Sequence, residues 1–342
     1  MPDVVASRDP DASRRGFAII LVMWIFMVLF VLGAEFSQAM RQDAVATSNF
    51  ADETQSYYLA SAAANLTFFR ALQEHEDARL GAPPLEAGTP GTDAQGAPPP
   101  PAVQPDGEWH AIDLWSTQVW VRVTDEGGKI PINSVDDTVL NHVFVNLGVD
   151  PKQASVISDS ILDWRDKDDE HRLNGAESDY YEGLPRPYIA KNAPLDSLEE
   201  LLLVKGVTPE LFYGGTEDYP IGLRDIFTVF TPRRNLNVMH APAEVLRAFF
   251  GLDQDELTQL LDVRSTSGGN VLDVLKAKLP DPRLSEMLSS EISPTVLSVE
   301  VQAQLPSSKV KTHIGAVVDL GESSEGVYIL RWMDQLPPED VP

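Results

Sequence analysis

The densest group of chemically active side chains in the sequence is an acidic run at residues 163–170, Asp-Trp-Arg-Asp-Lys-Asp-Asp-Glu. Five carboxylates within eight residues repel one another, so they need either full solvation or a compensating cation. Hard oxygen ligands at this density favour Ca²⁺ over softer metals. The run therefore leaves two alternatives open, an irregular calcium-binding loop and a solvated acidic loop.

The spacing of the acids agrees only partly with an EF-hand loop. If Asp166 is position 1, then Asp168, Glu170 and Glu177 fall at positions 3, 5 and 12. The glycine that an EF-hand needs at position 6 is missing, and His171 stands there. An irregular loop is therefore a better hypothesis than an EF-hand.

Catalysis has weaker support than cation binding. The chain contains no cysteine, which excludes disulfides, thiolate metal sites and cysteine nucleophiles. It has no His-x-x-x-His pair, no Walker loop, no dinucleotide-binding glycine motif and no Gly-x-Ser-x-Gly motif. We therefore expect a protein that is not an enzyme. The alternative is a metal-dependent hydrolase that uses Asp166, Asp168 and Glu177 and is tethered to a membrane by the apolar segment described below.

The overall charge argues against nucleic-acid binding. The chain of 342 residues carries 52 acidic and 26 basic side chains, and its net charge is −26. A surface of this sign repels phosphate backbones and suits cations or basic partners. Hydrophobic residues make up 43% of the chain, which is enough for a folded core, and the length allows about two domains.

The acidic run lies inside a long segment, residues 134–289, that we predict to be an inserted α-helical domain. Two parts of this region repeat one another, because residues 132–165 and 236–264 each contain an extended start, a helix, a glycine turn and a second helix. The sequence around Gly206 resembles the same pattern. Such helix pairs occur in DNA-binding helix-hairpin-helix modules, but these turns lack flanking bases, so we expect a packing role.

Residues 108–133 and 290–335 flank the insertion and are rich in residues that favour strands. We predict that they pair into one antiparallel sheet. The candidate strands lie at residues 115–123, 129–132, 296–304, 310–320 and 326–333.

An apolar segment near the N-terminus predicts a membrane span. Residues 17–34 contain no charged side chain, and as a helix they extend about 27 Å, close to the thickness of a bilayer core. Arg14 and Arg15 precede the segment, which places the N-terminus in the cytoplasm by the positive-inside rule. The rest of the chain is then expected on the far side of the membrane.

Residues 35–80 are predicted to continue the same helix, because they contain no proline and no glycine. A separate amphipathic helix is the alternative. Residues 81–107, with eight prolines, are predicted to be a linker that joins this helix to the sheet. Four apolar residues of the helix recur at helical spacing and are expected to pack on the sheet: Leu59, Ala62, Leu66 and Phe69.

The N-terminal residues resemble the prepilin leader of type IV pilins and type II pseudopilins. Arg14, Arg15 and Gly16 stand directly before Phe17 and the long apolar helix, as in those leaders. The resemblance implies that residues 1–16 are a leader and that prepilin peptidase cuts between Gly16 and Phe17 on the cytoplasmic side.

The fifth residue after this cleavage site is Leu21, whereas most pilins carry a glutamate there. That glutamate neutralises the terminal amine of a neighbouring subunit inside the apolar helix bundle. The departure is similar to the K class of minor pseudopilins, and it implies a subunit that sits at the tip of a fibre. The alternative is that Leu21 is simply one more lipid-facing residue.

The acidic run carries a second resemblance to the K class, the general secretion pathway protein K family. The similar stretches are the Asp-Trp-x-Asp-x-Asp pattern at residues 163–168, Gly-Ala-Glu at residues 175–177, Tyr180, and Asn-Ala-Pro-Leu-Asp at residues 192–196. The family binds calcium in this region. The resemblance therefore implies Ca²⁺ ligands among six residues: Asp166, Asp168, Asp169, Glu170, Glu177 and Asn192.

The same resemblance implies an α+β fold, in which a pilin-like long N-terminal helix lies on an antiparallel sheet and a large α-helical domain is inserted. It implies a minor pseudopilin at the tip of the type II secretion pseudopilus, with one span in the inner membrane and the globular part in the periplasm. The implied partners are two other minor pseudopilins in a tip complex of three, prepilin peptidase, inner-membrane lipid and secreted cargo, but no nucleic acid. A minor pilin of a type IV pilus or DNA-uptake machine is the alternative.

Overall fold

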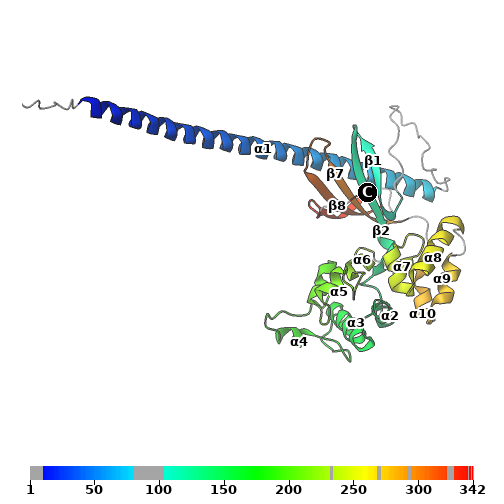
Figure 1. Cartoon of the computed structure of the whole chain (residues 1–342). Helices are drawn as coiled ribbons and strands as arrows, with labels where there is room; N and C mark the ends of the chain where they lie inside the picture. Colours follow the sequence, from blue (N-terminus) through cyan, green and yellow to red (C-terminus); the bar gives the residue numbers. More distant parts are fainter. Residues whose placement is uncertain are drawn as a thin grey trace, which may run out of the picture.

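The computed structural model describes residues 11–80, 104–231, 234–267, 271–290, 294–321, 327–337, 339 and 341. Its longest element is α1 (Asp11–Arg79), one helix of 69 residues that crosses the globular part and projects far beyond it (Figure 1). The prediction that residues 35–80 continue the apolar helix is thus confirmed. Residues 1–10 of the expected leader and most of the expected linker lie outside the described residues.

A five-stranded antiparallel sheet, in the order β1-β2-β7-β8-β9, packs against the second half of α1. The early and late parts of the chain therefore close one sheet across the insertion, as expected, and the α+β fold class is confirmed. The strands are β1 (Asp106–Leu114), β2 (Thr117–Asp125), β7 (Val296–Gln304), β8 (Lys311–Asp319) and β9 (Tyr328–Met333).

Two details of the predicted sheet are wrong. Residues 129–132 do not join it, because β3 (Ile130–Pro131) pairs in parallel with β4 (Phe227–Thr228) of the insertion. Trp115 is not in a strand but in the β1–β2 turn, where Trp115 and Ser116 both have positive φ angles. This turn escaped prediction because it lacks the glycine or asparagine that usually signals such backbone angles.

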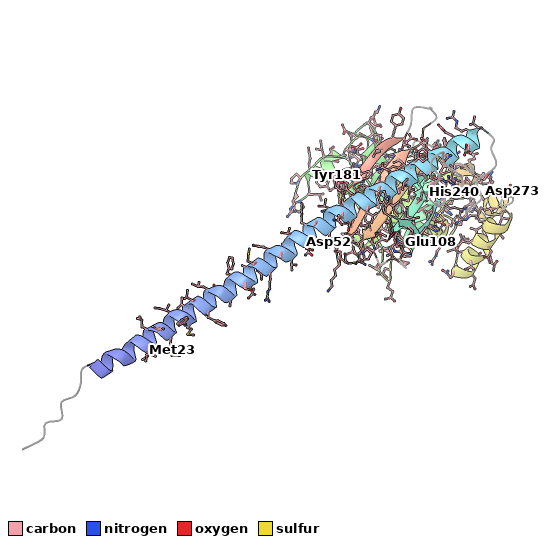
Figure 2. The ribbon with its side chains drawn as sticks, turned by 90° about the horizontal axis from the view of Figure 1, so that it is seen from above. Met23, Asp52, Glu108, Tyr181, His240 and Asp273 are labelled. Carbon is pink, nitrogen blue, oxygen red and sulfur yellow. The ribbon has the colours of Figure 1, made fainter. Side chains whose placement is uncertain are left out.

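One side of α1 packs on β7 and β8 and forms a core with the inward residues of the sheet. The helical stripe predicted for this contact is shifted, because Phe68 is buried whereas Phe69 is 65% exposed. The buried apolar positions of α1 are Leu59, Ala60, Ala63, Ala64 and Phe68. The alanines let the helix approach the strands closely, and Figure 2 shows α1 lying across the sheet from Asp52 onward, with Met23 on the projecting half.

The inserted domain, which we call the head (residues 134–289), has a second hydrophobic core of its own. It is mainly helical, as predicted, with two short parallel strand pairs, β3–β4 and β5–β6. Its helices are α2 (Asp137–Asn146), α3 (Pro151–Arg165), α4 (Ser178–Glu182), α5 (Pro209–Tyr213), α6 (Leu223–Ile226), α7 (Ala243–Phe250), α8 (Gln254–Ser267), α9 (Val271–Lys278) and α10 (Pro282–Glu286), with a 3-10 helix at Leu198–Leu203. Its other strands are β5 (Leu236–Asn237) and β6 (Leu288–Ser289).

The internal repeat of the head is present in the structure. Gly148 turns between α2 and α3, and Gly251 turns between α7 and α8, each with a positive φ angle that favours glycine. In both copies an arginine of the second helix donates to backbone carbonyl groups of the first segment. Arg165 donates to the carbonyls of Ile132 and Val135, and Arg264 donates to the carbonyl of Ala241. These arginines hold the helix pairs together, which agrees with the expected packing role.

A buried polar joint connects the end of β2 to the head. The carboxylate of Asp125 accepts a bond of 2.9 Å from the side-chain amide of Asn237 and lies 3.1 Å from Nδ1 of His240. The adjacent Glu126 accepts from the hydroxyl of Thr228 and, at 2.9 Å, from Nζ of Lys129. Since breaking such buried bonds leaves unpaired polar groups, the joint holds the head in one orientation on the sheet.

Candidate metal-binding loop of the head

The acidic run begins on α3 and continues into the loop that leads to α4. Asp150 caps the start of α3 by accepting from the backbone amides of Lys152 and Gln153, and Pro151 occupies the first turn. The helix ends at Arg165, so Asp163 still lies on the helix and Asp166 is the residue at its C-cap. The remaining acids follow in a loop of extended backbone and turns.

Asp163 is completely buried and organises the loop from the helix side. Its carboxylate accepts from the backbone amide of Arg172 at 3.2 Å, and the guanidinium of Arg172 lies 3.4 Å away. A side chain at Gly175 would overlap this carboxylate, which explains why glycine stands there. Burial raises the pKa of Asp163, and the charge of Asp166 adds to this effect. Asp163 was not among the predicted ligands, although its place as the first acid of the acidic run was a usable signal.

Glu177 lies immediately before α4 and is only 2% exposed. Burial raises the pKa of this carboxyl to about 7, and the charges of Asp163, Asp166 and Asp169 contribute to the increase. Electrostatic coupling to all three acids means that the fold has brought them close to Glu177. A carboxylate held in such surroundings is costly to ionise unless a cation accompanies it.

Asn192 joins this group from a distant part of the loop region. Its side-chain amide nitrogen donates to the backbone carbonyl of Asp168 at 3.2 Å and to the carboxylate of Asp169 at 2.9 Å. Its backbone has a positive φ angle of 49°, a conformation that asparagine tolerates better than most residues. The two bonds orient the amide, so its oxygen atom points away from the residues that the nitrogen binds.

Four oxygen atoms of this region are buried and have no hydrogen-bond partner in the described structure. They are Oδ1 of Asp166, Oε1 and Oε2 of Glu177, and Oδ1 of Asn192. Buried oxygen acceptors almost always find a donor, so four orphans in one loop region are unusual. Carboxylate and amide oxygens without donors are the ligands that Ca²⁺ prefers. The residues present therefore fit a hard divalent cation.

Among the described residues, no group of three or more histidine, aspartate or glutamate side chains is arranged to hold a metal ion. The orphaned atoms agree with this finding, because they come from two carboxylates and one amide rather than from three acids.

Sequence analysis proposed three further ligands, and the structure places them differently. Asp168, Asp169 and Glu170 are exposed, and the carboxylate of Asp168 accepts from the backbone amide of Glu170. Asp169 is engaged with Asn192. The four acids at EF-hand spacing do not form one group, because Asp168 and Glu170 are exposed to solvent.

Trp164 anchors the loop to the core of the head. It is 3% exposed, and its ring meets the rings of Tyr181 and Tyr188 edge-on at centroid distances of 5.2 and 6.2 Å. The two tyrosines follow Glu177, so this aromatic cluster fixes the far end of the loop against α3. Lys205 strengthens the closure by donating to the carbonyls of Asn174 and Gly175 at 3.2 and 2.9 Å.

The remaining predicted site residues lie on α1, far from this loop (Figure 1). Gly16 and Phe17 fall within the helix, and Leu21 is half exposed on its projecting part. Among the described residues, one helix is long and apolar enough to cross a membrane by length and composition, the part of α1 that starts at Ile19.

The chain is similar to known proteins in both sequence and structure. Residues 123–213, which include the whole acidic loop, match the family model described as Type II secretion system (T2SS), protein K. The type II secretion system protein K of Klebsiella pneumoniae is 24% identical over 281 residues, covering 75% of this chain and 76% of that protein. That of Aeromonas hydrophila is 26% identical over 219 residues, covering 59% of this chain and 62% of that protein.

Among solved structures, the fold is similar to one chain in the crystal structure of the GspK–GspI–GspJ complex from the type 2 secretion system of enterotoxigenic Escherichia coli. The TM-score is 0.59 at 15% sequence identity, and the match covers 85% of this chain and 99% of that chain. At this level of identity the likeness concerns the fold.

Proposed function

We propose that this chain, which is similar to the type II secretion system protein K family, is a minor pseudopilin and caps the tip of the secretion pseudopilus. After removal of residues 1–16 by prepilin peptidase, α1 anchors the subunit in the inner membrane with its globular part in the periplasm. There it assembles with two other minor pseudopilins and supports protein export across the outer membrane. The role is structural rather than catalytic.

The observation that carries this proposal is the form of α1. The helix runs without a break from its apolar half into the sheet, and every residue from 19 to 50 is exposed. Apolar side chains in the first part of this stretch are exposed along the described helix, so they need lipid or the helices of other subunits as partners. A pseudopilin needs both environments in turn, first the membrane and then the fibre.

Leu21 supports the position at the tip. A subunit that docks beneath another one needs a carboxylate near its N-terminus to neutralise the amine of its neighbour. The leucine offers no such charge, so another subunit gains nothing by packing above this one. The head extends beside the sheet and away from the projecting half of α1, which leaves it free for contacts at the end of a fibre (Figure 1).

Co-purification tests this function. The full chain carrying an affinity tag is produced in its own secretion system, after deletion of the native gene, and is purified from detergent-solubilised inner membranes. The two other minor pseudopilins are expected to co-purify with it, and secretion of cargo into the medium is expected to recover. A chain that restores secretion without ever binding the other minor pseudopilins would contradict the tip complex.

The acidic loop has a place in the same proposal as a structural Ca²⁺ site. Asp166, Glu177 and Asn192 would hold the ion with their orphaned oxygens, and Asp168, Asp169 and Glu170 at the rim are further candidates. When bound, the ion would supply the positive charge that the buried carboxylates lack. The residues of the loop already tie α3 to α4, so binding would stiffen the part of the head that projects farthest from the sheet.

A further inference from the structure

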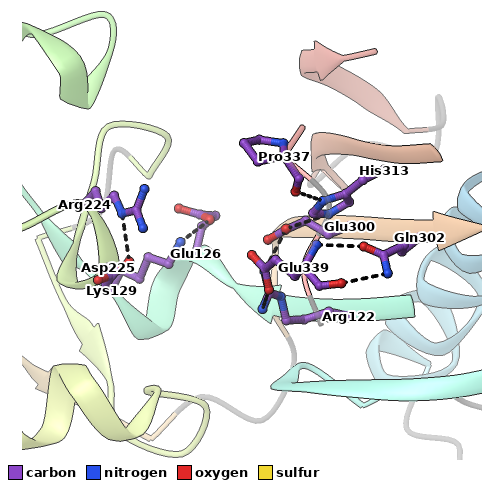
Figure 3. A network of polar contacts seen from close by, with 10 residues as sticks. All are labelled: Arg122, Glu126, Lys129, Arg224, Asp225, Glu300, Gln302, His313, Pro337 and Glu339. Carbon is purple, nitrogen blue, oxygen red and sulfur yellow. Dashed lines mark hydrogen bonds and ion pairs between the residues drawn. The ribbon is translucent and has the colours of Figure 1, made fainter. Parts of the chain in front are cut away.

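The face of the sheet that points away from α1 carries a row of polar side chains where an outer face would normally be solvated. Arg122 on β2 pairs in register with Glu300 on β7, and Gln302 on β7 pairs in register with His313 on β8. The residues that alternate with them face α1 and its core. We call these four residues the polar seat (Arg122, Glu300, Gln302 and His313), and Figure 3 shows them together.

Contacts within the sheet position three of the four residues of the polar seat. Nη2 of Arg122 lies 2.8 Å from the carboxylate of Glu300, and its guanidinium stacks on the ring of Trp109 at 4.5 Å from the centroid. Nε2 of His313 lies 3.2 Å from the same carboxylate. Gln302 and His313 are each only 3% exposed. The sheet thus fixes Arg122 and His313 against Glu300, whereas the side chain of Gln302 is bonded to the C-terminal tail.

The C-terminal tail (residues 334–342) occupies the polar seat through its described residues, 334–337 and 339. Nη1 and Nη2 of Arg122 donate to the two carboxylate oxygens of Glu339, at 2.9 and 3.1 Å. Gln302 binds both backbone groups of Glu339, accepting from its amide at 2.9 Å and donating to its carbonyl at 3.0 Å. Nδ1 of His313 lies 2.6 Å from the carbonyl of Pro337, and the backbone carbonyl of His313 accepts from the amide of Leu336 at 2.8 Å.

These contacts define what the polar seat recognises. A primary amide that pairs with both backbone groups of one residue selects an extended strand of any sequence. A two-pronged guanidinium contact selects a carboxylate at that residue. Both ring nitrogens of His313 face oxygen acceptors, so the imidazole can donate to both of them only when it is protonated. One N–H then binds Glu300, and the other binds a backbone carbonyl two residues before the glutamate of the ligand. The matching ligand is an extended peptide with a glutamate.

The tail is held in a way that allows it to leave. In its described residues the tail forms no strand, and the side chain of Leu336 lies close to Gly315. The side chain of Glu339 remains 45% exposed. Apart from the charged pair of Arg122 and Glu339, each of these hydrogen bonds adds little net stability, so the segment can open without unfolding of the sheet.

We propose that the polar seat is a peptide-binding site for extended acidic segments, and that the chain's own C-terminal tail is its resting ligand. When the tail leaves, the same site binds a similar segment of a partner protein. This segment is extended, and its glutamate lies two residues after the residue whose backbone carbonyl contacts His313. The site lies on the outer face of the sheet, whereas Asp334 at the start of the tail accepts a bond of 2.8 Å from the hydroxyl of Tyr57 on α1.

A peptide in trans tests the proposal. The full chain ending at Met333 is titrated in detergent with a fluorescent peptide of residues 334–342. We expect saturable binding that weakens at least tenfold with the Glu339→Gln peptide, with a scrambled peptide of the same composition, or with the Arg122→Gln protein. Arg331→Gln on β9, an arginine of the same sheet outside the polar seat, is the matched control and should bind normally. The intact chain should bind more weakly than the shortened one, because its own tail competes.

A shortened protein that melts cooperatively but fails to bind the peptide, or binds the scrambled peptide equally well, overturns the proposal. If the shortened protein does not fold, amide exchange in the intact chain decides. The amides of Leu336 and Glu339 are expected to be protected, yet to exchange faster than those of β7, and faster still in Arg122→Gln. Exchange of these two amides only at the rate of global unfolding, or at the rate of a free peptide, would overturn it as well.

Discussion

Glu177 shows how a single buried carboxylate can couple the head to its solvent. Its pKa is raised to about 7 by burial first and by neighbouring acids second. An acid whose pKa is higher in the folded than in the unfolded state destabilises the fold once it ionises. Without a cation, the stability contributed by this group is therefore lost as the pH rises from about 4.5 through 7.

We predict that millimolar Ca²⁺ raises the melting temperature of the full chain at neutral pH by about 5 °C or more, through linkage of binding to folding. Glu177→Gln removes a buried charge, so it should raise the melting temperature without Ca²⁺ and abolish most of the Ca²⁺-dependent shift. Thermal melts with and without Ca²⁺ measure both effects. Glu182→Gln, an exposed acid on α4, is the matched control. Equal shifts in both variants would refute the site.

His313 provides a second test at the scale of one residue. Burial acts to lower its pKa, but its bonds to the Glu300 carboxylate and the Pro337 carbonyl outweigh this effect, and the pKa is raised. The stability that comes from protonated His313 is therefore complete below about pH 6.5 and is lost as the pH rises through the higher folded value.

We expect His313→Asn to destabilise the chain by about 1–2 kcal/mol at pH 6, because a buried hydrogen-bonded network loses its donors. The difference from the wild type should shrink steadily as the pH rises toward 9. Melting curves of both proteins across this range provide the measurement. A difference that is constant with pH would show that His313 is not protonated in the native state.

At the scale of elements, α1 combines two roles that its sequence keeps separate. At about 1.5 Å per residue its 69 residues reach about 104 Å, which is enough to cross a bilayer and still cover the sheet. The side chains of the apolar half are exposed, whereas the second half is buried on β7 and β8 through alanines. The element therefore anchors at one end and folds at the other.

Gly16→Asp is expected to block removal of the leader, because the peptidase would no longer find the small residue before Phe17. The uncut precursor should stay in the membrane, and N-terminal sequencing of the purified protein would show residues of the leader instead of Phe17. Gly33→Ala, a glycine of the same apolar segment with open space around it, should be processed normally. Normal processing of Gly16→Asp would contradict the leader assignment.

At the scale of the whole molecule, the two cores are separate, one under α1 and one in the head. The joint of Asp125, Glu126, Asn237 and His240 fixes them relative to each other with buried polar bonds. A tip subunit with a rigid head presents the same surface in each assembly. The acidic loop and the polar seat lie in different parts of this body, so each can be changed without the other.

The proposed position at the end of the fibre can be tested by adding a carboxylate at residue 21. Leu21→Glu is expected to insert into the membrane normally but to let another subunit dock above, since it supplies the missing carboxylate. Pseudopili assembled with this variant should be longer or misregulated when they are measured by electron microscopy. Leu32→Ala, which changes the same helix without adding charge, is the control. Fibres of unchanged length would leave the role of Leu21 without support.

The sequence by itself determined the features that depend on local pattern. These are the apolar span, the unbroken helix behind it, the late strands of the sheet, the helical insertion with its repeat, and the acidic run. Each is encoded by periodicity, composition or breakers within a short window. The first strand was missed because β1 begins at Asp106, inside the predicted linker, and because its residues alternate acids with apolar groups without a long β-branched run.

Only the tertiary structure decided which residues share a site. Asp166 and Asn192 are far apart in the chain, yet the fold brings both into the candidate metal site. They differ from Asp168 and Glu170 in burial, which no local sequence pattern specifies. The polar seat is a stronger example, because Arg122 and His313 come from opposite sides of the insertion and meet through strand register alone. Long-range pairing is set by the packing of the whole core, so a sequence window does not contain it.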